Sequence, residues 1–243
     1  MKPYEHAAER GVPSLVWRAG QERRLQMIAK WAKLDNASIL IDGVGVGTYA
    51  SQIRKRYTSD VEAFDIEFER AQEARLETPH TVVAAAEALP YPANRFDTIL
   101  SHEVLEHVED DRKAVQEMVR VLKPGGRVVI FAPNRWYPFE THGHYWKGEY
   151  HFGNTPLINY LPDRWRNQLA PHVKAYTGRV IKGLFEECPV RVVLHQRVYG
   201  GYDNIIARLG QPGRILRDML YRLEGTPLDV FGLSHLLVME KTH

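Results

Sequence analysis

Residues 38–47 of the chain read Ser-Ile-Leu-Ile-Asp-Gly-Val-Gly-Val-Gly, and this stretch decides the fold class. Its apolar first half predicts a short buried strand, and a helical segment follows the glycines at about residues 49–57. Glycine at positions 43, 45 and 47 allows a tight turn and a close approach to a ligand. The start of the helix then offers free N–H groups. The stretch therefore predicts a strand, a ligand-binding loop and a helix in direct succession.

The alternation of short apolar runs and helical segments continues around this loop. The further predicted strands are residues 61–66, 81–85, 96–101, 127–132, 190–199 and 234–241. The further predicted helices are residues 14–34, 67–77, 104–122, 176–187 and 213–224. Strands and helices that alternate at this spacing form βαβ units, which build a parallel sheet with helices on both faces. We therefore expect an α/β fold with a Rossmann-like, seven-stranded and mostly parallel sheet.

Residues 134–172, directly after the fifth predicted strand, break this pattern. The segment is rich in aromatic residues and prolines and shows no clear periodicity. A long region without a pattern of its own is typically a functional lid or binding loop. We expect residues 1–243 to form a single domain, with 134–172 as a substrate-facing insert and 1–35 as an N-terminal helical cap. Three residues of the cap are predicted to help close a pocket: Tyr4, Trp17 and Arg18.

Charge and composition argue against several classes of protein. The 32 basic and 30 acidic side chains nearly balance, whereas binding to nucleic acid needs a concentrated basic face. The single cysteine, Cys188, excludes an intramolecular disulfide framework and a multi-cysteine zinc site. No secretory signal is visible, and no stretch approaches the roughly 20 apolar residues that span a bilayer. We expect a cytoplasmic protein with no nucleic-acid partner and no membrane span, and the oligomeric state stays open.

The glycine loop by itself is compatible with two cofactors, a nicotinamide dinucleotide and S-adenosylmethionine. The chain reads Gly45-x-Gly47-x-x-Ala50, and Asp65 follows Gly45 by 20 residues, which satisfies a loose dinucleotide fingerprint. Asp65 ends the second predicted strand, where its carboxylate can accept both hydroxyls of an adenosine ribose. The same residue could instead cap the helix that follows. The loop alone does not decide between the two cofactors.

Three more segments accompany the glycine loop in order along the chain. They are Ala-Glu-Ala-Leu-Pro-Tyr at residues 86–91, Phe-Asp through Val-Leu-Glu-His-Val at residues 96–108, and Val-Leu-Lys-Pro-Gly-Gly at residues 121–126. With these segments, residues 39–133 resemble the class I S-adenosylmethionine-dependent methyltransferases of the small-molecule, ubiquinone-biosynthesis-like type. A nicotinamide dehydrogenase is not expected to carry all three. The resemblance implies S-adenosylmethionine as the cofactor.

The resemblance also implies which residues bind that cofactor. The positions are Gly43, Gly45, Gly47, Asp65, Ile66, Ala86, Glu87, Ser101 and His102. The glycine loop would hold the methionine end of the cofactor and Asp65 its ribose, while Ile66 would pack on the adenine. Ala86 and Glu87 would line the adenine. Ser101 and His102, at the end of the fourth predicted strand, would lie beside the sulfonium.

Two positions depart from the family pattern. The family usually places an acid two residues before the first glycine, where this chain has Ile41, and the acid is Asp42. Along a strand a shift by one residue turns the side chain to the other face, so contact of Asp42 with the cofactor requires an irregular strand end. Ala85 stands where the family often has an aspartate for the adenine amino group. Adenine recognition would then depend on backbone groups and packing.

Acidic and histidine side chains near the expected pocket are candidates for catalysis. Glu103, Glu106 and His107 would share one side of the predicted helix. Some ubiquinone-type relatives bind a divalent metal with a similar set, but we favour acids that stabilise a helix N-terminus and a packed histidine, and predict no metal. His142, in the run Thr-His-Gly-His of the insert, can take a proton from a hydroxyl near neutral pH. We predict His142 or Glu103 as the catalytic base, with surface or lid packing as the alternative role of the histidines.

The predicted reaction is methyl transfer to a small-molecule acceptor, at a hydroxyl group. Direct in-line displacement requires the protein mainly to position the acceptor, exclude water and remove a proton. The alternatives are a catalytically silent module that binds the cofactor or a partner, and an NAD(P)-dependent oxidoreductase. A methyltransferase that acts on RNA or protein is disfavoured by the balanced charge.

Overall fold

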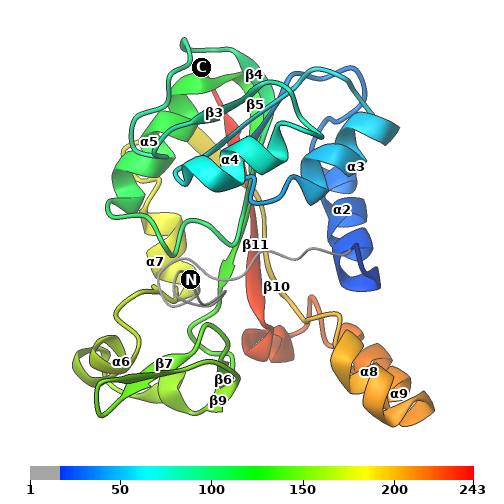
Figure 1. The fold of residues 1–243 in the computed structure, drawn as a ribbon, viewed down its shortest axis with the longest axis vertical. Coiled ribbons are helices and arrows are strands. Elements are labelled where there is room, and N and C mark those ends of the chain that lie inside the picture. Colours follow the sequence, from blue (N-terminus) through cyan, green and yellow to red (C-terminus); the bar gives the residue numbers. More distant parts are fainter. Residues whose placement is uncertain (1–16) are drawn as a thin grey trace.

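A seven-stranded sheet forms the centre of the molecule in the computed structural model, which describes residues 17–243 (Figure 1). Its strands are β1 (Ile39–Asp42), β2 (Val61–Asp65), β3 (Thr81–Val83), β4 (Phe96–His102), β5 (Leu122–Pro133), β10 (Val190–Val198) and β11 (Ser234–Lys241). They lie in the order β10-β11-β5-β4-β1-β2-β3. The strands from β5 to β3 are parallel, whereas β11 runs antiparallel to both of its neighbours. The predicted α/β fold with a seven-stranded, mostly parallel sheet is confirmed.

Helices cover both faces of this sheet (Figure 1). The helices within residues 17–243 are α2 (Ala19–Trp31), α3 (Thr48–Arg56), α4 (Phe68–Ala74), α5 (Asp111–Val121), α6 (Asp163–Leu169), α7 (Gly178–Gly183), α8 (Asp203–Leu209) and α9 (Gln211–Tyr221), with short 3-10 turns η1 (Ile158–Tyr160) and η2 (Pro227–Phe231). Of these, α6, α8 and α9 lie away from the sheet. On one face, α5 and α7 pack over Leu40 and Ile130. On the other face, α2 and α3 pack over Ile41 and Val129. Adjacent residues of β1 and β5 thus supply opposite cores, as the two-residue period of a strand requires.

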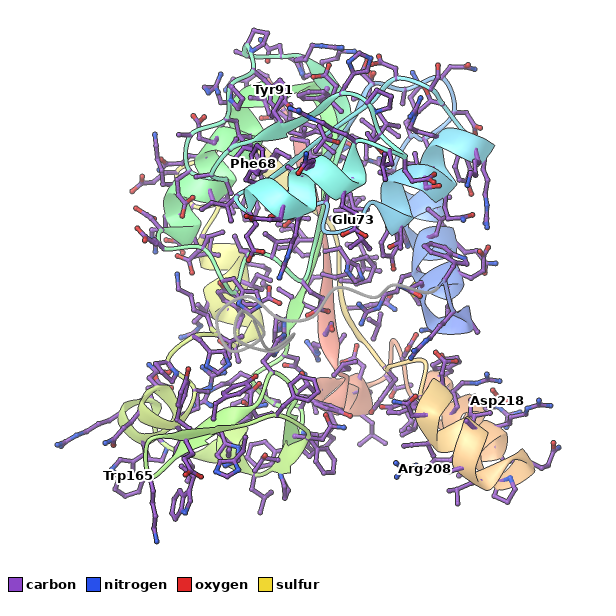
Figure 2. The ribbon with its side chains drawn as sticks, viewed as in Figure 1. Phe68, Glu73, Tyr91, Trp165, Arg208 and Asp218 are labelled. Carbon is purple, nitrogen blue, oxygen red and sulfur yellow. The ribbon has the colours of Figure 1, made fainter. Side chains whose placement is uncertain are left out.

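Residues 134–172, the insert after β5, form a separate layer beyond the carboxyl end of that strand (Figure 1). This insert contains two small ladders, β6 (Phe139–Glu140) with β9 (Thr155–Pro156) and β7 (His144–Trp146) with β8 (Glu149–His151). Across the molecule, α8 and α9 form a helical pair, and Figure 2 shows Trp165 of α6 and Arg208 of α8 at opposite sides. Strands of two or three residues leave no periodic signal, which explains why the sequence predicted none of these strands. The short helix α6, also within the insert, was not predicted either.

The prediction of a helix at residues 104–122 is wrong at the start of that helix. α5 begins at Asp111, because the Asp110 carboxylate caps it by accepting a hydrogen bond from a backbone N–H of the first turn. Further upstream, Glu103 has a φ of +56°, a left-handed backbone that a right-handed helix does not contain. Residues 103–110 are therefore irregular, and the Glu-x-x-Glu-His set does not share one side of a helix.

Smaller differences from the prediction concern the helices after residue 175 and the N-terminal cap. The helix predicted at 176–187 is limited to α7, the helix predicted at 213–224 begins at Gln211, and α8 was not predicted. Of the predicted cap residues, Tyr4 lies outside the described residues. None of the helices among residues 17–243 is long and apolar enough to cross a membrane.

Candidate active site

A cavity of about 930 Å³ opens beyond the carboxyl ends of the central parallel strands, where ligands of such sheets bind. The loops after β1, β2, β3 and β4 all line it, and we call the part bordered by the glycine loop and the loops after β2 and β3 the glycine end. Thr141, His142 and Phe152 of the insert line the part that we call the insert end, and Gln21 and Arg24 of α2 also line the cavity. The sheet loops, the N-terminal helix and the insert therefore meet around one space.

The glycine loop approaches the cavity with left-handed backbone angles. Gly43 and Gly45 line the cavity with φ of +63° and +53°, a region in which only glycine avoids a steric penalty. A Cβ on Gly43 would lie 2.3 Å from Cγ2 of Val104. Gly47 is not among the lining residues, and with φ +80° it forms the N-cap of α3. Two of the three predicted glycines thus border the ligand space, and the third shapes the turn into the helix.

Asp65 fastens the glycine loop to the end of β2. Its Oδ2 accepts a hydrogen bond from the Gly45 N–H at 2.9 Å, and its Oδ1 accepts one from the Glu67 N–H at 3.0 Å. The N-cap of α4 is Glu67, so helix capping is not the role of Asp65. Each Asp65 oxygen keeps a lone pair, so ribose hydroxyls can still donate to it.

The residues predicted to surround the adenine lie at the same end of the cavity. Ile66 lines the cavity with 52% of its surface exposed, which offers an apolar face to a flat ring. Ala86 also lines the cavity. The Glu87 carboxylate accepts hydrogen bonds from the backbone N–H groups of Glu109 and Asp110, at 2.9 and 3.2 Å. Glu87 therefore ties the loop after β3 to the loop after β4.

Asp42, the acid one residue away from the family position, borders the cavity at the last position of β1. Its side chain is buried, and its Oδ2 accepts a hydrogen bond from the Ser101 hydroxyl at 2.6 Å. Its Oδ1 has no hydrogen-bond partner among the described residues. Burial, reinforced by the charges of Asp65 and Glu87, raises the pKa of Asp42 to about 7. Ser101, which does not line the cavity, thus supports Asp42 from behind.

Arg24 of α2 joins two predicted site residues in one polar cluster. Its Nη1 donates to His102 Nε2 at 2.6 Å and to Glu103 Oε1 at 3.2 Å. Burial and the arginine charge together lower the pKa of His102 to about 3. Burial opposes the charge on Glu103, but Arg24 and the Ser234 hydroxyl, which donates at 2.7 Å, outweigh it and lower the pKa of Glu103 to about 2. Glu103 is therefore ionised and paired, which makes it a weak base.

Sequence reasoning missed Arg24, because a charged residue on an amphipathic helix is usually solvated. The one available signal is its spacing of three residues from Gln21, which puts both on the same side of α2. Of the cap residues that the sequence indicated, Trp17 packs edge-on against Tyr49, a lining residue, with ring centroids 5.1 Å apart. Arg18 instead is the N-cap residue of α2, where its backbone N–H donates to the Gln21 side chain at 2.7 Å.

His142 of the insert meets Glu106 and His107 at the insert end of the cavity, which the two histidines line. Nε2 of His142 lies 3.6 Å from Glu106 Oε1, and Nε2 of His107 lies 3.9 Å from the same oxygen. Glu106 is 1% exposed, and neither carboxylate oxygen has a hydrogen-bond partner among the described residues. Burial, together with the charge of Glu103, raises the pKa of Glu106 well above its ordinary value. Glu106 is thus a buried carboxyl group without local compensation.

Glu140 and Arg166 hold His142 in this position. Glu140 Oε1 accepts a hydrogen bond from the His142 backbone N–H at 2.9 Å and lies 3.3 Å from its Nδ1. Arg166 Nη2 donates to the other Glu140 oxygen at 2.8 Å, and this ion pair is buried. His144 instead stacks on His151, with ring centroids 5.4 Å apart. Of these three histidines, only His142 lines the cavity.

Comparisons with known proteins agree with this geometry. Residues 41–130 match the family model of a methyltransferase domain. The chain is 26% identical over 158 residues to a 2-methyl-6-phytyl-1,4-hydroquinone methyltransferase of Synechocystis sp., a match that covers 61% of this chain and 48% of that protein. It is 53% identical over 49 residues to a ubiquinone/menaquinone biosynthesis C-methyltransferase, UbiE, of Enterobacter sp., or 20% of each chain. The match thus spans less than half the length of these curated relatives.

Solved structures share the fold over most of the chain. An S-adenosylmethionine-dependent methyltransferase from Mesorhizobium loti superimposes with a TM-score of 0.65 at 19% identity, over 92% of this chain and 98% of that one. The [4+2]-cyclase SpnF superimposes with a TM-score of 0.60 at 17% identity, over 93% of this chain and 82% of that one. At such low identities the superpositions establish the fold alone.

Residues 41–130 therefore belong to a class I S-adenosylmethionine-dependent methyltransferase domain. The family predicted from the sequence, its Rossmann-like fold and S-adenosylmethionine as the family's cofactor are confirmed. The fold does not by itself specify the reaction or the acceptor, because the same fold occurs in a [4+2]-cyclase.

Proposed function

We propose that the protein transfers the methyl group of S-adenosylmethionine to a small-molecule acceptor, at a hydroxyl oxygen. The observation that carries the proposal is one cavity that the glycine loop, Asp65 and His142 all line. Its volume of about 930 Å³ lies near the top of the range of small-molecule sites, roughly 300–1,000 Å³. Such a volume leaves room for an acceptor beside the cofactor.

The residues at the glycine end fit the cofactor. The backbone at Gly43 and Gly45 allows the methionine end to approach closely, and the unpartnered buried oxygen of Asp42 suits its positive charge. Asp65 keeps lone pairs for the ribose hydroxyls, and Ile66 offers an apolar surface to the adenine. The bound cofactor would supply a methyl group that its sulfonium activates towards displacement.

The insert end supplies the proton acceptor. The Glu140 carboxylate lies 3.3 Å from Nδ1 of His142, which leaves Nε2 as the lone-pair nitrogen of the ring. Glu103, the other candidate base, is held by Arg24 and Ser234. In the reaction the acceptor oxygen bonds to the methyl carbon, the electrons of the sulfur–carbon bond stay on sulfur, and His142 takes the hydroxyl proton.

The two flanking segments support the same assignment. Gln21 and Arg24 reach the cavity from the segment 1–35, and Thr141 and Phe152 reach it from the insert. Residues 1–35 as a cap and 134–172 as a substrate-facing insert of one domain thus stay part of the proposal. The Synechocystis relative is named for a hydroquinone, a ring that carries hydroxyl groups, and a ring-bearing phenolic acceptor is the class we propose first.

Calorimetry and a transfer assay test the proposal on the full chain. We expect S-adenosylmethionine and S-adenosylhomocysteine to bind and NAD not to bind. With donor labelled at the methyl group, we expect a labelled small molecule to form in a metabolite extract. Tight NAD binding without a response to the methyl donor would overturn the proposal, and cofactor binding without transfer to any acceptor would favour a silent module.

The atom that receives the methyl group is read from the labelled product. A methyl ether supports the hydroxyl acceptor. A new carbon–carbon bond, as the name of the Enterobacter relative implies for that protein, would correct the acceptor atom while leaving methyl transfer in place.

A further inference from the structure

We propose that Glu106, His107 and His142 form a binding site for a divalent transition-metal ion of the zinc type. Each residue offers one ligand atom, and the three atoms lie within 4.8 Å of one another. Two imidazole nitrogens and one carboxylate oxygen are ligands that zinc prefers, and three protein ligands leave one coordination position open. Tetrahedral bonds of about 2.0–2.1 Å put ligand atoms about 3.3 Å apart, so the cluster must contract by at most about 1.5 Å to bind the ion.

The hydrogen bonds of the two rings direct both Nε2 lone pairs into the cluster. Nδ1 of His107 lies 3.2 Å from the carbonyl oxygen of His172, and Nδ1 of His142 lies 3.3 Å from Glu140 Oε1. A carbonyl and a carboxylate only accept hydrogen bonds, so each Nδ1 carries the proton and each Nε2 is an acceptor. The hydrogen bonds therefore assign the tautomer that ligates a metal through Nε2.

The carboxylate between the rings lacks a donor. Nε2 of His142 and of His107 lie 3.6 and 3.9 Å from Glu106 Oε1, and both Glu106 oxygens lack a hydrogen-bond partner within residues 17–243. Two lone-pair nitrogens and one buried carboxyl group thus converge, and neither oxygen of that group has a hydrogen-bond partner within residues 17–243. Buried polar groups are otherwise almost always satisfied, and a shared cation satisfies all three at once.

The groups behind the ligands fix their orientation. The Tyr150 hydroxyl donates to the His142 carbonyl at 2.5 Å, and Nε2 of His172 lies 3.1 Å from the same oxygen. Arg166 donates to Glu140 at 2.8 Å and so holds the carboxylate that orients the His142 ring. A carboxylate that accepts a hydrogen bond from the second ring nitrogen is the usual support of a histidine that binds a metal.

The ligand set differs from the one that the sequence suggested. Glu103 accepts hydrogen bonds from Arg24 and Ser234, and it is not one of the three residues whose ligand atoms converge, although its charge acts on Glu106. Its place is taken by His142 from the insert, so the ion would connect the insert to the loop after β4. Because His107 and His142 both line the cavity, the open coordination position would face the acceptor.

The consequence for catalysis rests on the proposed function, whereas metal binding itself does not. A hydroxyl bound at the open position would lose its proton more readily, because the ion stabilises the oxyanion. With the ion bound, His142 would be a ligand, so the hydroxyl proton would pass to solvent water instead of to this ring.

Equilibrium dialysis of the untagged full chain, after treatment with a chelator, tests the site with zinc. We expect one tightly bound zinc per chain in the wild type and at least a tenfold loss of affinity in Glu106→Gln and His142→Ala. The matched control is His144→Ala, which removes a histidine of the same insert that does not line the cavity, and it should bind zinc as the wild type does. Glu140→Gln should weaken zinc binding about 10–100-fold through the orientation of His142.

Cobalt(II) gives a readout that a purely structural role would not change. Tetrahedral coordination by the three side chains gives cobalt an intense visible spectrum in the wild type and in His144→Ala, and Glu106→Gln should lose it. Circular dichroism checks that each variant is folded. Absence of a saturable site in the wild type, or equal losses in His142→Ala and His144→Ala, would overturn the metal site, and calorimetry with S-adenosylmethionine reports separately on the proposed function.

Discussion

The two ends of the cavity are built in opposite ways. At the glycine end, the carboxylates of Asp65 and Glu87 accept hydrogen bonds from backbone N–H groups of neighbouring loops. At the insert end, Glu106 and His142 come from distant parts of the chain, and the Glu106 oxygens lack hydrogen-bond partners within residues 17–243. Asp42 is the partial exception at the glycine end, since one of its oxygens is also unpartnered. The difference teaches that backbone groups can complete a site without its ligand, whereas a meeting of distant side chains can leave buried polar atoms without a partner.

The largest effect is expected from Gly43→Ala, at the end built from the main chain. The new Cβ would lie 2.3 Å from Val104 Cγ2, on a residue with φ +63°. Overpacking and backbone strain each cost on the order of 1–3 kcal/mol. We expect a lower thermal unfolding midpoint and, by calorimetry, at least a roughly 100-fold loss of affinity for S-adenosylmethionine.

The matched control for this variant is Gly125→Ala. Gly125 has a similar φ of +75°, but a Cβ there would meet nothing within 4 Å. It should carry the cost of backbone strain and leave cofactor affinity unchanged. Equal losses of affinity in the two variants would show that strain, not the close approach at position 43, determines binding.

The insert end should be sensitive to its ion pair instead. Arg166→Met leaves the buried Glu140 carboxylate without its cation, which typically costs about 3–5 kcal/mol. We expect faster hydrogen exchange in the segment 134–172 and unchanged affinity for S-adenosylmethionine, because the glycine end does not depend on this pair. Arg164→Met, on the exposed side of the same helix, is the control. A large loss of cofactor affinity in Arg166→Met would contradict the independence of the two ends.

Asp42→Asn gives a stability change that depends on pH. Burial raises the pKa of Asp42 from 3.8 to about 7, so the folded protein keeps a proton that the unfolded chain releases between these values. The stability of the wild type therefore falls as pH rises from about 4 to about 7, and asparagine removes this loss. In urea unfolding we expect the variant to be more stable than the wild type by up to about 4 kcal/mol at pH 8, with no gain near pH 4.

The same substitution should weaken the binding of the positively charged cofactor about tenfold at pH 8, through loss of the carboxylate. For the wild type, affinity for S-adenosylmethionine should rise from pH 6 to pH 8 as Asp42 ionises. A gain in stability that is the same at pH 4 and pH 8 would refute the raised pKa.

The smallest effect is expected from Glu103→Gln. The glutamine carbonyl can still accept hydrogen bonds from Arg24 and Ser234, and Glu103 is too well paired to act as a base. Once an acceptor is known, turnover should fall less than about tenfold, whereas His142→Ala should lower kcat about 10²–10⁴-fold. The reverse order of the two effects would make Glu103 the base and His142 a structural residue.

Particular residues show how far local patterns reach. Gly43, Asp65 and Ile66 could be found from sequence, because each lies at or just after the end of a predicted strand and parallel strands end at one edge of the sheet. The helix start before Asp111 was predicted wrongly, since the apolar spacing of residues 104–108 imitates a helix while Asp110 provides the actual cap. Local spacing therefore predicts which loops form the site better than it predicts the conformation of an irregular loop.

By itself, the sequence determined the order of the sheet strands along the chain, the glycine loop and the family, because each of these depends on residues that are neighbours in the chain. Only the tertiary structure decided that Arg24 pairs with His102 and Glu103, and that His142 meets Glu106. These contacts depend on how α2 and the insert pack against the sheet loops. Packing of this kind joins distant residues through shape and burial, which no local period in the sequence encodes.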